Sequence, residues 1–578
     1  MRLASPRTGA MPSSSAKRAS IRRRRCREVV GRPLAVNASR RSRFSCSAGL
    51  IMATAVALAG CGRTVGGGGE SVADARAGRL RPATESLAGT AEAPAGGSLS
   101  ALAQSKVERF CGDCHPLPAP ESFPRDRWPK EVRQGFDFYL ASLRTDLPRP
   151  PEGDAIRYFQ ATAPDRLSVP RAADRPESPP PIVFQPVTGL TGADTPDPAV
   201  AQVVALPRTG AGTTPLRLLS TDMRSGEIRS WELSGESARG EVVARLAHPC
   251  RLTAATPRTV GTDTPAGEDG WFVGDLGSFL PEDHAEGGVF FFPGGPRAGE
   301  PVPIRRGLGR VIEAVPFDWD QDGRRDLLVA EFGWRAGGAL RMIPGGAEPG
   351  AVSGAADVVI DPRHGVLDLR VADLDGDGQD DVVAAFAQEH ESVEAWFSRG
   401  KGTYDHREIA RFPDPSWGSS GIDIADLDSD GDLDILHANG DTMDSGLARP
   451  THGIRALLND GAAGFRIVEI ARMPGVSQVR AADLDGDGDL DVVASAVHPG
   501  AAAEPPGTFD AVIWVEQGRG GLWIPHSVER DDCRYAAFTL ADADGDGRID
   551  IVAGVWLAES SGVPAPAIRV WLNRAATP

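Results

Sequence analysis

One short stretch of the sequence brings two thiols and an imidazole together. Residues 111–115 read Cys-Gly-Asp-Cys-His. Two cysteines at this spacing, followed directly by histidine, are the attachment pattern of a c-type haem, in which both thiols bond the porphyrin edge and the histidine ligates iron. Cys111, Cys114 and His115 are therefore the predicted site of a covalent haem.

A redox-active Cys-x-x-Cys site and a zinc half-site are the two other interpretations of these residues. A thioredoxin-like site would need a helix after the motif, whereas Pro116, Pro118 and Pro120 follow it, and a helix cannot continue through them. A zinc site would need more ligands nearby, but residues 62–180 contain no further Cys or His. Covalent haem fits these flanks best.

The sixth position on the iron has no obvious ligand. Residues 53–222 contain no Met, and His115 is the one His among them. The position is therefore open, or it is filled from another residue: Lys130, Tyr139, Tyr158 or, from the next domain, Met223. Without Met the reduction potential should be lower than that of Met/His cytochromes.

A second pattern places four carboxylates within nine residues. Asp-x-Asp-x-Asp-Gly-x-x-Asp occurs five times, with starts 55, 53, 57 and 59 residues apart. Alternate Asp residues around a tight turn gather hard oxygen ligands, which suit Ca²⁺. Metal-free Asp-Gly turns are the alternative, but four carboxylates per loop repel one another without a cation. About five Ca²⁺ ions are predicted, on Asp318, Asp320, Asp322, Asp326; Asp373, Asp375, Asp377, Asp381; Asp426, Asp428, Asp430, Asp434; Asp483, Asp485, Asp487, Asp491; and Asp542, Asp544, Asp546, Asp550.

The elements around these loops are strands. The first six positions match an EF-hand, but its bidentate Glu at position 12 is replaced by Val329 in the first copy and Ala384 in the second. Apolar runs such as 369–372 and 382–385 flank the loop, which indicates strand–loop–strand. A period of 53–59 residues is typical of stacked or radial repeats.

These loops resemble the FG-GAP/VCBS repeats of integrin-type β-propellers, over residues 182–578. The resemblance implies four-stranded blades with calcium between the first two strands. Two degenerate units precede the five, one around Asp222–Gly226 and one around Asp275–Gly277, and neither should bind calcium. Seven blades follow, and the last lacks an outer strand that residues 182–187 could supply. The expected fold class is mostly β: a seven-bladed propeller with calcium loops, preceded by a small α-helical domain that resembles cytochrome c.

The N-terminal part reads as an export signal and a tether. Residues 1–60 hold 13 Lys and Arg and one acid, then an apolar stretch ending in Leu-Ala-Gly before Cys61. This ending resembles the bacterial lipobox, which implies that Cys61 is lipidated; Gly62 then favours the outer membrane. Translation could also start at Met11. The domains expected are a signal at 1–60, a flexible linker at 61–100, the haem domain at 101–175 and the propeller at 180–578.

The charge balance excludes one class of partner. The chain carries 62 Lys and Arg against 79 Asp and Glu, so its net charge is −17, and beyond residue 60 it is −29. Such a surface repels nucleic acid.

The propeller face opposite calcium should carry the loops between second and third strands. Four of the ten His lie there, His284, His390, His452 and His498, either as ordinary solvated residues or as a metal, substrate or haem-facing surface. Cys250 and Cys533 are either a disulfide or two buried thiols.

The leading hypothesis is an exported, lipid-anchored electron-transfer protein of a Gram-negative-type cell envelope, facing the periplasm, with the propeller as a docking or ligand-binding platform. Its redox partner, a protein or a small-molecule donor, is not specified by the sequence. No Gly-x-Ser-x-Gly elbow, phosphate loop or dinucleotide fingerprint is present, so substrate chemistry is not indicated. A periplasmic dehydrogenase or lyase that uses the His-bearing face is the second hypothesis. A surface adhesion or ligand-recognition module is the third.

Overall fold

The computed structural model describes residues 98–172, 180–208, 214–255 and 269–576, apart from 296, 298, 336, 347–349, 353, 444 and 462–463. The expected signal, Cys61 and most of the linker lie outside these residues. None of the described helices is both long enough and apolar enough to cross a bilayer.

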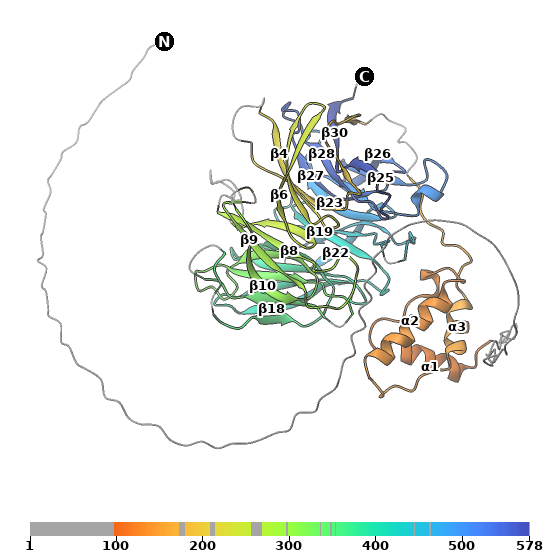
Figure 1. Ribbon diagram of the computed structural model, residues 1–578. Helices are drawn as coiled ribbons and strands as arrows, with labels where there is room; N and C mark the ends of the chain where they lie inside the picture. Colours follow the sequence, from red (N-terminus) through yellow and green to blue (C-terminus); the bar gives the residue numbers. More distant parts are fainter. Residues whose placement is uncertain are drawn as a thin grey trace, which may run out of the picture. The chain divides into compact units, whose positions relative to one another are not determined.

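Three α-helices and one 3₁₀ turn make the N-terminal part of the described chain (Figure 1). They are α1 (Ala101–Cys111), η1 (Pro120–Ser122), α2 (Trp128–Ala141) and α3 (Glu152–Gln160). Ser100 caps α1 by accepting a hydrogen bond from the Ala103 N–H at 3.3 Å. The indole of Trp128 stacks on Phe159 at 4.0 Å between ring centres, which joins α2 to α3. The helices therefore share a small apolar core of their own.

Seven four-stranded antiparallel sheets form the rest, so the predicted seven-bladed β-propeller is confirmed. The first three blades are β3 (Val200–Ala205), β4 (Leu216–Asp222), β5 (Glu227–Ser234) and β6 (Ser237–Arg245); β7 (Pro249–Ala254), β8 (Gly270–Asp275), β9 (Gly287–Pro293) and β10 (Val302–Leu308); and β11 (Val311–Phe317), β12 (Asp326–Glu331), β13 (Ala339–Ile343) and β14 (Val358–Asp361).

The next three blades follow the same order. They are β15 (Val366–Ala372), β16 (Asp381–Phe386), β17 (Ser392–Ser398) and β18 (Tyr404–Arg411); β19 (Ser419–Ala425), β20 (Asp434–Asn439), β21 (Gly453–Asn459) and β22 (Phe465–Arg472); and β23 (Val476–Ala482), β24 (Asp491–Ala496), β25 (Asp510–Gly518) and β26 (Leu522–Arg530), with a 3₁₀ turn, η2 (Ala501–Ala503), before β25.

The seventh blade is built from both ends of the propeller segment. It consists of β27 (Tyr535–Ala541), β28 (Asp550–Val555), β30 (Ile568–Ala575) and β1 (Ile182–Pro186). β1 pairs antiparallel with β30, so that Ile182 lies opposite Ala575. A small ribbon of β2 (Asp194–Pro196) and β29 (Pro564–Pro566) lies beside this junction in the sequence. The ring thus closes with strands from the two ends of the segment.

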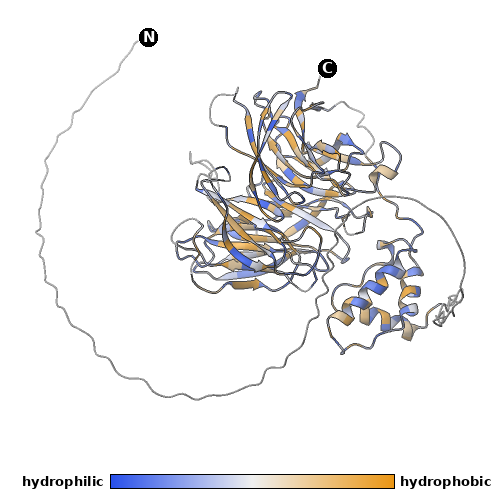
Figure 2. Ribbon diagram, in the orientation of Figure 1, coloured by the Kyte–Doolittle hydropathy of each residue, from blue (hydrophilic) through white to orange (hydrophobic). Residues whose placement is uncertain are grey.

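The second strand of each Asp-loop blade is its most buried part. All six residues of β12, β16, β20, β24 and β28 are buried. After one leading Asp these strands are mostly apolar, because both of their faces pack against neighbouring blades. Figure 2 shows the apolar colouring that runs through the blades. Cys250 and Cys533 are both buried, unpaired thiols.

The helical part and the propeller lie in one compact unit and touch each other. The Ala119 N–H donates a hydrogen bond to the Asp414 carboxylate at 2.8 Å. Arg449 donates to the Ser122 carbonyl at 2.8 Å, and its guanidinium lies 4.4 Å from the centre of the Phe123 ring. Asp414 and Arg449 belong to loops that precede β19 and β21, on the face opposite the Asp-rich loops.

Candidate functional site

The five Asp-rich loops occupy one position in the fold. Each loop connects the first strand of a blade to the second, and the ninth residue of each loop is the first residue of that second strand. The short turn follows from Gly at the sixth position, which adopts a left-handed conformation in all five loops (φ between 85° and 100°). A residue with a Cβ would be strained there.

Three of the four predicted carboxylates come together in each of four loops. One oxygen from each lies within 4.8 Å of the other two, and the groups are Asp318, Asp320, Asp326; Asp373, Asp375, Asp381; Asp426, Asp428, Asp434; and Asp483, Asp485, Asp491. The fifth-position residues Asp322, Asp377, Asp430 and Asp487 lie outside these groups. In all five loops, Asp546 of the last included, the fifth-position carboxylate accepts a hydrogen bond from the backbone N–H two residues later, at 2.8–3.0 Å.

The ninth Asp of each loop is held by the backbone on both of its oxygens. In the third Asp loop, Asp434 accepts from the Leu427 N–H at 2.8 Å and from the Asn459 N–H, at the end of β21, at 2.7 Å. Asp550 of the last loop is held in the same way by Ala543 and Asn573. Each ninth Asp therefore joins the loop to the third strand of its blade as well as facing the other carboxylates.

Burial in these loops disfavours ionised carboxylates. Burial raises the pKa of Asp434 to about 6, of Asp491 to about 7 and of Asp550 to about 6. Repulsion by neighbouring Asp residues also raises these pKa values, whereas the backbone hydrogen bonds lower them. A divalent cation would offset this repulsion directly. The donor set of carboxylate oxygens in a turn fits Ca²⁺.

The Asp residues of the two degenerate units lie at another place in the blade than the Asp-rich loops. Asp222 ends β4 and Asp275 ends β8, so both lie between the second and third strands of their blades, on the face opposite the Asp-rich loops. Asp222 accepts a hydrogen bond from the Ala199 N–H at 2.9 Å, and Asp275 accepts from the Ala247 N–H at 2.9 Å. These carboxylates tie each second strand to the chain that enters the same blade.

The Cys-x-x-Cys-His segment begins at the last residue of α1. Cys111 ends the helix, and burial raises the pKa of its thiol to about 11. Cys114 is exposed and lies 3.0 Å from the Arg144 guanidinium, which also pairs with Asp113 at 2.6 Å. Arg144 therefore holds the loop between the two cysteines against the end of α2.

One ring nitrogen of His115 is hydrogen-bonded to the backbone. Its Nδ1 lies 2.8 Å from the Pro116 carbonyl, so Nδ1 carries the proton and donates, which leaves Nε2 as the unprotonated nitrogen. Histidines that bind metals usually donate their other N–H to a carbonyl or carboxylate in this manner. The helical part also exposes apolar side chains, Leu140 (51%) and Leu143 (86%), close in sequence to Arg144. Residues and surface together fit a covalently bound haem.

Of the candidates for the sixth iron ligand, the two Tyr residues have hydrogen-bond partners, and the other two are described by their position in the fold. The Tyr139 hydroxyl accepts from the Leu147 N–H at 3.1 Å, and the Tyr158 hydroxyl donates to Glu108 at 3.2 Å. Lys130 lies in the first turn of α2, and Met223 in the turn after β4. The structure does not single out one of these four.

The four His residues of the opposite face lie in second-to-third-strand loops, as the sequence indicates. His452 and His498 are buried, whereas His284 and His390 are half-buried. In each of the four, one ring nitrogen is buried without a hydrogen-bond partner: His284 Nε2, His390 Nε2, His452 Nε2 and His498 Nδ1. His364, which precedes β15, also reaches this face and was missed by the sequence analysis. The sequence contained a signal for its position, because His364 stands shortly before a first strand and first strands begin at this face.

Acid should destabilise the protein through two buried imidazoles. Burial, with the charges of Arg455 and Arg449, lowers the pKa of His437 and His452 to about 3 from 6.5. Only the unfolded chain then takes up these protons below pH 6.5, so stability present above that pH is lost as pH falls. We expect a loss of about 1.4 kcal/mol per pH unit for each group.

Urea unfolding at saturating calcium, followed between about pH 6.5 and pH 5, measures this slope. His437→Gln should make this slope shallower. Equal slopes in the variant and the wild type would contradict the prediction.

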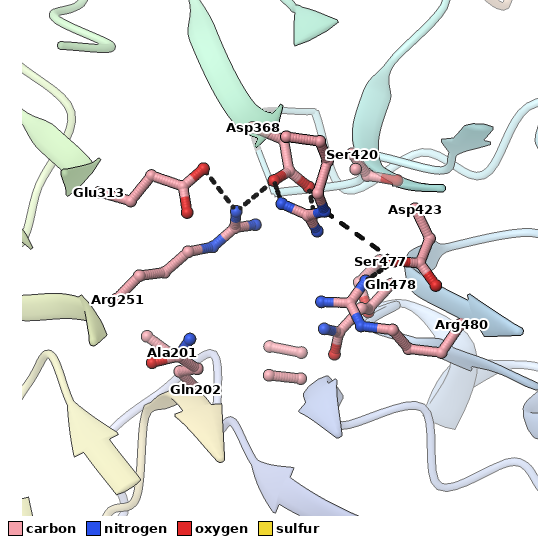
Figure 3. A pocket seen from close by; sticks show the side chains of 14 residues that line it. Ala201, Gln202, Arg251, Glu313, Asp368, Ser420, Asp423, Ser477, Gln478 and Arg480 are labelled. Atoms are coloured by element: carbon pink, nitrogen blue, oxygen red, sulfur yellow. Dashed lines mark hydrogen bonds and ion pairs between the residues drawn. The ribbon is translucent and has the colours of Figure 1, made fainter. Parts of the chain in front are cut away.

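A second feature that sequence reasoning missed is the charged axis of the propeller (Figure 3). A cavity of about 190 Å³ is lined by the first strands of all seven blades. Arg251 pairs with Asp368 at 2.7 Å and with Glu313 at 3.2 Å, and Arg370 also contacts Asp368. The ionised residues of blades three to six stand three or five positions before an Asp-rich loop, which is the signal that could have placed them.

Asp368 is the acid on which this network depends. Despite its burial, Arg251 and Arg370 hold the pKa of Asp368 below its usual range. Asp368→Asn would leave two buried guanidinium groups with less compensation, and the free energy of unfolding should fall by about 3–5 kcal/mol in urea titrations. Asp423→Asn is the matched control, since Asp423 lies 3.9 Å from Arg370 and should cost less. If the Asp368→Asn variant unfolds at the same urea concentration as the wild type, the network does not depend on Asp368.

Seven four-stranded blades, five of them with the same Asp-rich loop, define a β-propeller assembled from repeats. Residues 373–437 match the sequence model of the FG-GAP-like repeat, from the second Asp loop to β20. The repeat interpretation is thereby confirmed. A comparison with curated proteins finds no significant match. A propeller with such repeats is consistent with a ligand-binding or docking platform.

Proposed function

We propose that the protein is a lipid-anchored electron-transfer protein of the bacterial cell envelope, with a propeller that calcium rigidifies as its docking platform. The observation that carries this proposal is the hydrogen bond from His115 Nδ1 to the Pro116 carbonyl, at 2.8 Å, directly after Cys111 and Cys114. It prepares one ring nitrogen for iron beside two thiols at haem spacing. Haem bound there would supply one-electron redox chemistry.

The chain's own residues set the conditions of that site. Arg144 fixes the loop of Asp113 and Cys114 through its bonds to both residues. The Pro116 carbonyl fixes the His115 tautomer by accepting a hydrogen bond from its Nδ1–H. Lipid on Cys61 would keep the protein at a membrane surface, and the proposed setting is the periplasmic side of an outer membrane.

In this proposal the propeller provides a rigid framework and a surface that recognises a partner. Calcium in five loops would fix the first two strands of five blades, while the opposite face stays available for a partner. The partner is a redox protein or a small-molecule donor, and the acidic chain makes nucleic acid a poor one.

A redox titration of the purified, calcium-loaded protein tests this proposal. We expect an alkaline pyridine spectrum of covalent haem, one reversible one-electron step, and a potential below that of Met/His cytochromes. Haem that can be neither reduced nor reoxidised by small soluble electron carriers would reject electron transfer while leaving attachment intact. Dye reduction driven by sugars or alcohols would favour a dehydrogenase instead.

A further inference from the structure

Three metal-ligating side chains meet on the face opposite the Asp-rich loops. His364 lies between β14 and β15, and Glu389 and His390 lie between β16 and β17. One ligand atom from each is within 4.8 Å of the other two. His364 Nε2 lies 3.1 Å from Glu389, and the two imidazole rings are 5.1 Å apart. We infer that these three residues bind a divalent transition-metal ion, in a site separate from the calcium loops and independent of the haem proposal.

A backbone hydrogen bond joins the two loops that carry these ligands. The Ala387 N–H donates to the Gly365 carbonyl at 2.8 Å, which joins the residue after His364 to the loop that carries the other two ligands. Gly365 has φ +84°, and a Cβ there would lie 2.8 Å from the Ala387 carbonyl oxygen. Only glycine permits this approach, so the ligands are positioned before any ion arrives.

The loop that presents Glu389 and His390 is strained on both sides of them. Gln388 has φ 60° and Glu391 has φ 39°, and neither residue is glycine. Non-glycine residues in this region cost of order 1–3 kcal/mol each, and such strain concentrates at functional sites. Glu391 also accepts hydrogen bonds from the Gly418 and Ser419 N–H groups at 2.9 Å, which anchors this end of the loop to the next blade.

The ligand atoms have few competing partners. His390 Nε2 is buried and accepts or donates no hydrogen bond. The nearest strong cation, Arg363, is paired with Asp361 at 2.7 Å and with Glu394 at 2.6 Å. Its charge is therefore already compensated, and the side-chain partner of the Glu389 carboxylate is the other proposed ligand, His364. The ring of Phe386, 6.5 Å from that of His390, gives the site an apolar side.

The donor set selects the kind of ion. Two imidazoles and one carboxylate suit Zn²⁺, Fe²⁺ or Cu²⁺, whereas Ca²⁺ prefers oxygen ligands alone. Ligands at about 2.1 Å from a tetrahedral ion lie about 3.4 Å from one another, so small side-chain rotations would complete the site. Three protein ligands leave a further coordination position for water or a small ligand. Glu389 is 33% exposed, so this position can be reached from solvent.

Zinc titration of the full, calcium-saturated chain tests the inference. Excess Ca²⁺ keeps the Asp-rich loops occupied, and calorimetry should then show one Zn²⁺ bound per chain. His390→Ala, His364→Ala and Glu389→Gln should each weaken binding by about 100-fold or more, since even outer-shell partners are worth 10–100-fold. X-ray absorption at the zinc edge should show two imidazole nitrogens, a readout that haem iron does not affect.

A matched His–Glu pair on the same blade is the control. His406 Nε2 lies 2.7 Å from Glu394, without the third ligand, and His406→Ala should bind zinc as the wild type does. Calcium-dependent melting of each variant verifies folding. Equal zinc affinity in wild type and His390→Ala, a loss as large in His406→Ala, or a zinc spectrum without histidine scattering would each overturn the site.

Discussion

Chelating calcium is expected to lower the melting temperature of the protein by roughly 15 °C. An ion at 100 times its Kd stabilises a fold by about 2.7 kcal/mol, so five loops contribute about 13 kcal/mol, as much as the whole stability of many domains. An unfolding entropy of about 2.1 cal/mol/K per residue converts that loss into the temperature shift for a propeller of this length. Calorimetry in excess EDTA and in excess Ca²⁺ measures it.

Single loops provide the internal check on this expectation. Asp426→Asn removes one charge from the third Asp loop and should reduce the chelator effect by about one fifth, or roughly 3 °C. Asp405→Asn removes an acid of the outer strand β18, 47% exposed, and should leave the effect unchanged. Superimposable melting curves with EDTA and with Ca²⁺ would show that the loops hold no structural calcium.

Replacing Cys111 and Cys114 together by Ala is expected to abolish covalent haem. Both thioethers are lost, and His115 alone would hold haem only reversibly. Denaturing gels stained for haem peroxidase activity, and pyridine spectra after acid–acetone extraction, distinguish covalent from extractable haem. Each single variant should retain one thioether and give a shifted pyridine spectrum.

The buried propeller thiols give the matching control. Cys250→Ala and Cys533→Ala also remove cysteines, but both lie in blades and should leave the haem stain unchanged. The Cys111/Cys114 variant should keep the calcium-dependent melting of the propeller, because the helices have their own apolar core. Haem that stays covalent in the double variant, or a wild-type protein without haem, would refute attachment at this motif.

Regularly repeated features were predictable from the sequence, and features that depend on packing between blades were not. Asp and Gly recur with a period of 53–59 residues, and apolar runs flank them, so strand pairs and blade number could be deduced. The first two blades lack that marker, and their Asp222 and Asp275 end second strands instead of standing in a first-to-second-strand loop. A short-range pattern cannot tell which of two turns in a blade it occupies.

The candidate metal ligands also fall into those predictable from the sequence and those brought together only by the fold. The first, third and ninth Asp of a loop are close in sequence, and the turn brings them together in space. His364 and Glu389 are 25 residues apart and meet only because neighbouring strands start and end at one face. The axial ion pairs are more distant still: Arg251 and Asp368 are 117 residues apart. Contacts of this kind require the closed ring.

Pairing of β1 with β30 has a consequence for the order of folding. Ile182 and Ala575 are paired although about 390 residues separate them. Pairing them costs chain entropy, and contacts can compensate for this cost only once the last blade is available. During synthesis the helices and the first blades emerge long before β30 does. β1 must then wait as an unpaired edge strand, exposed to aggregation, until the final blade arrives. We therefore expect ring closure to be the slow step of folding, and chaperones to protect this strand until it is complete.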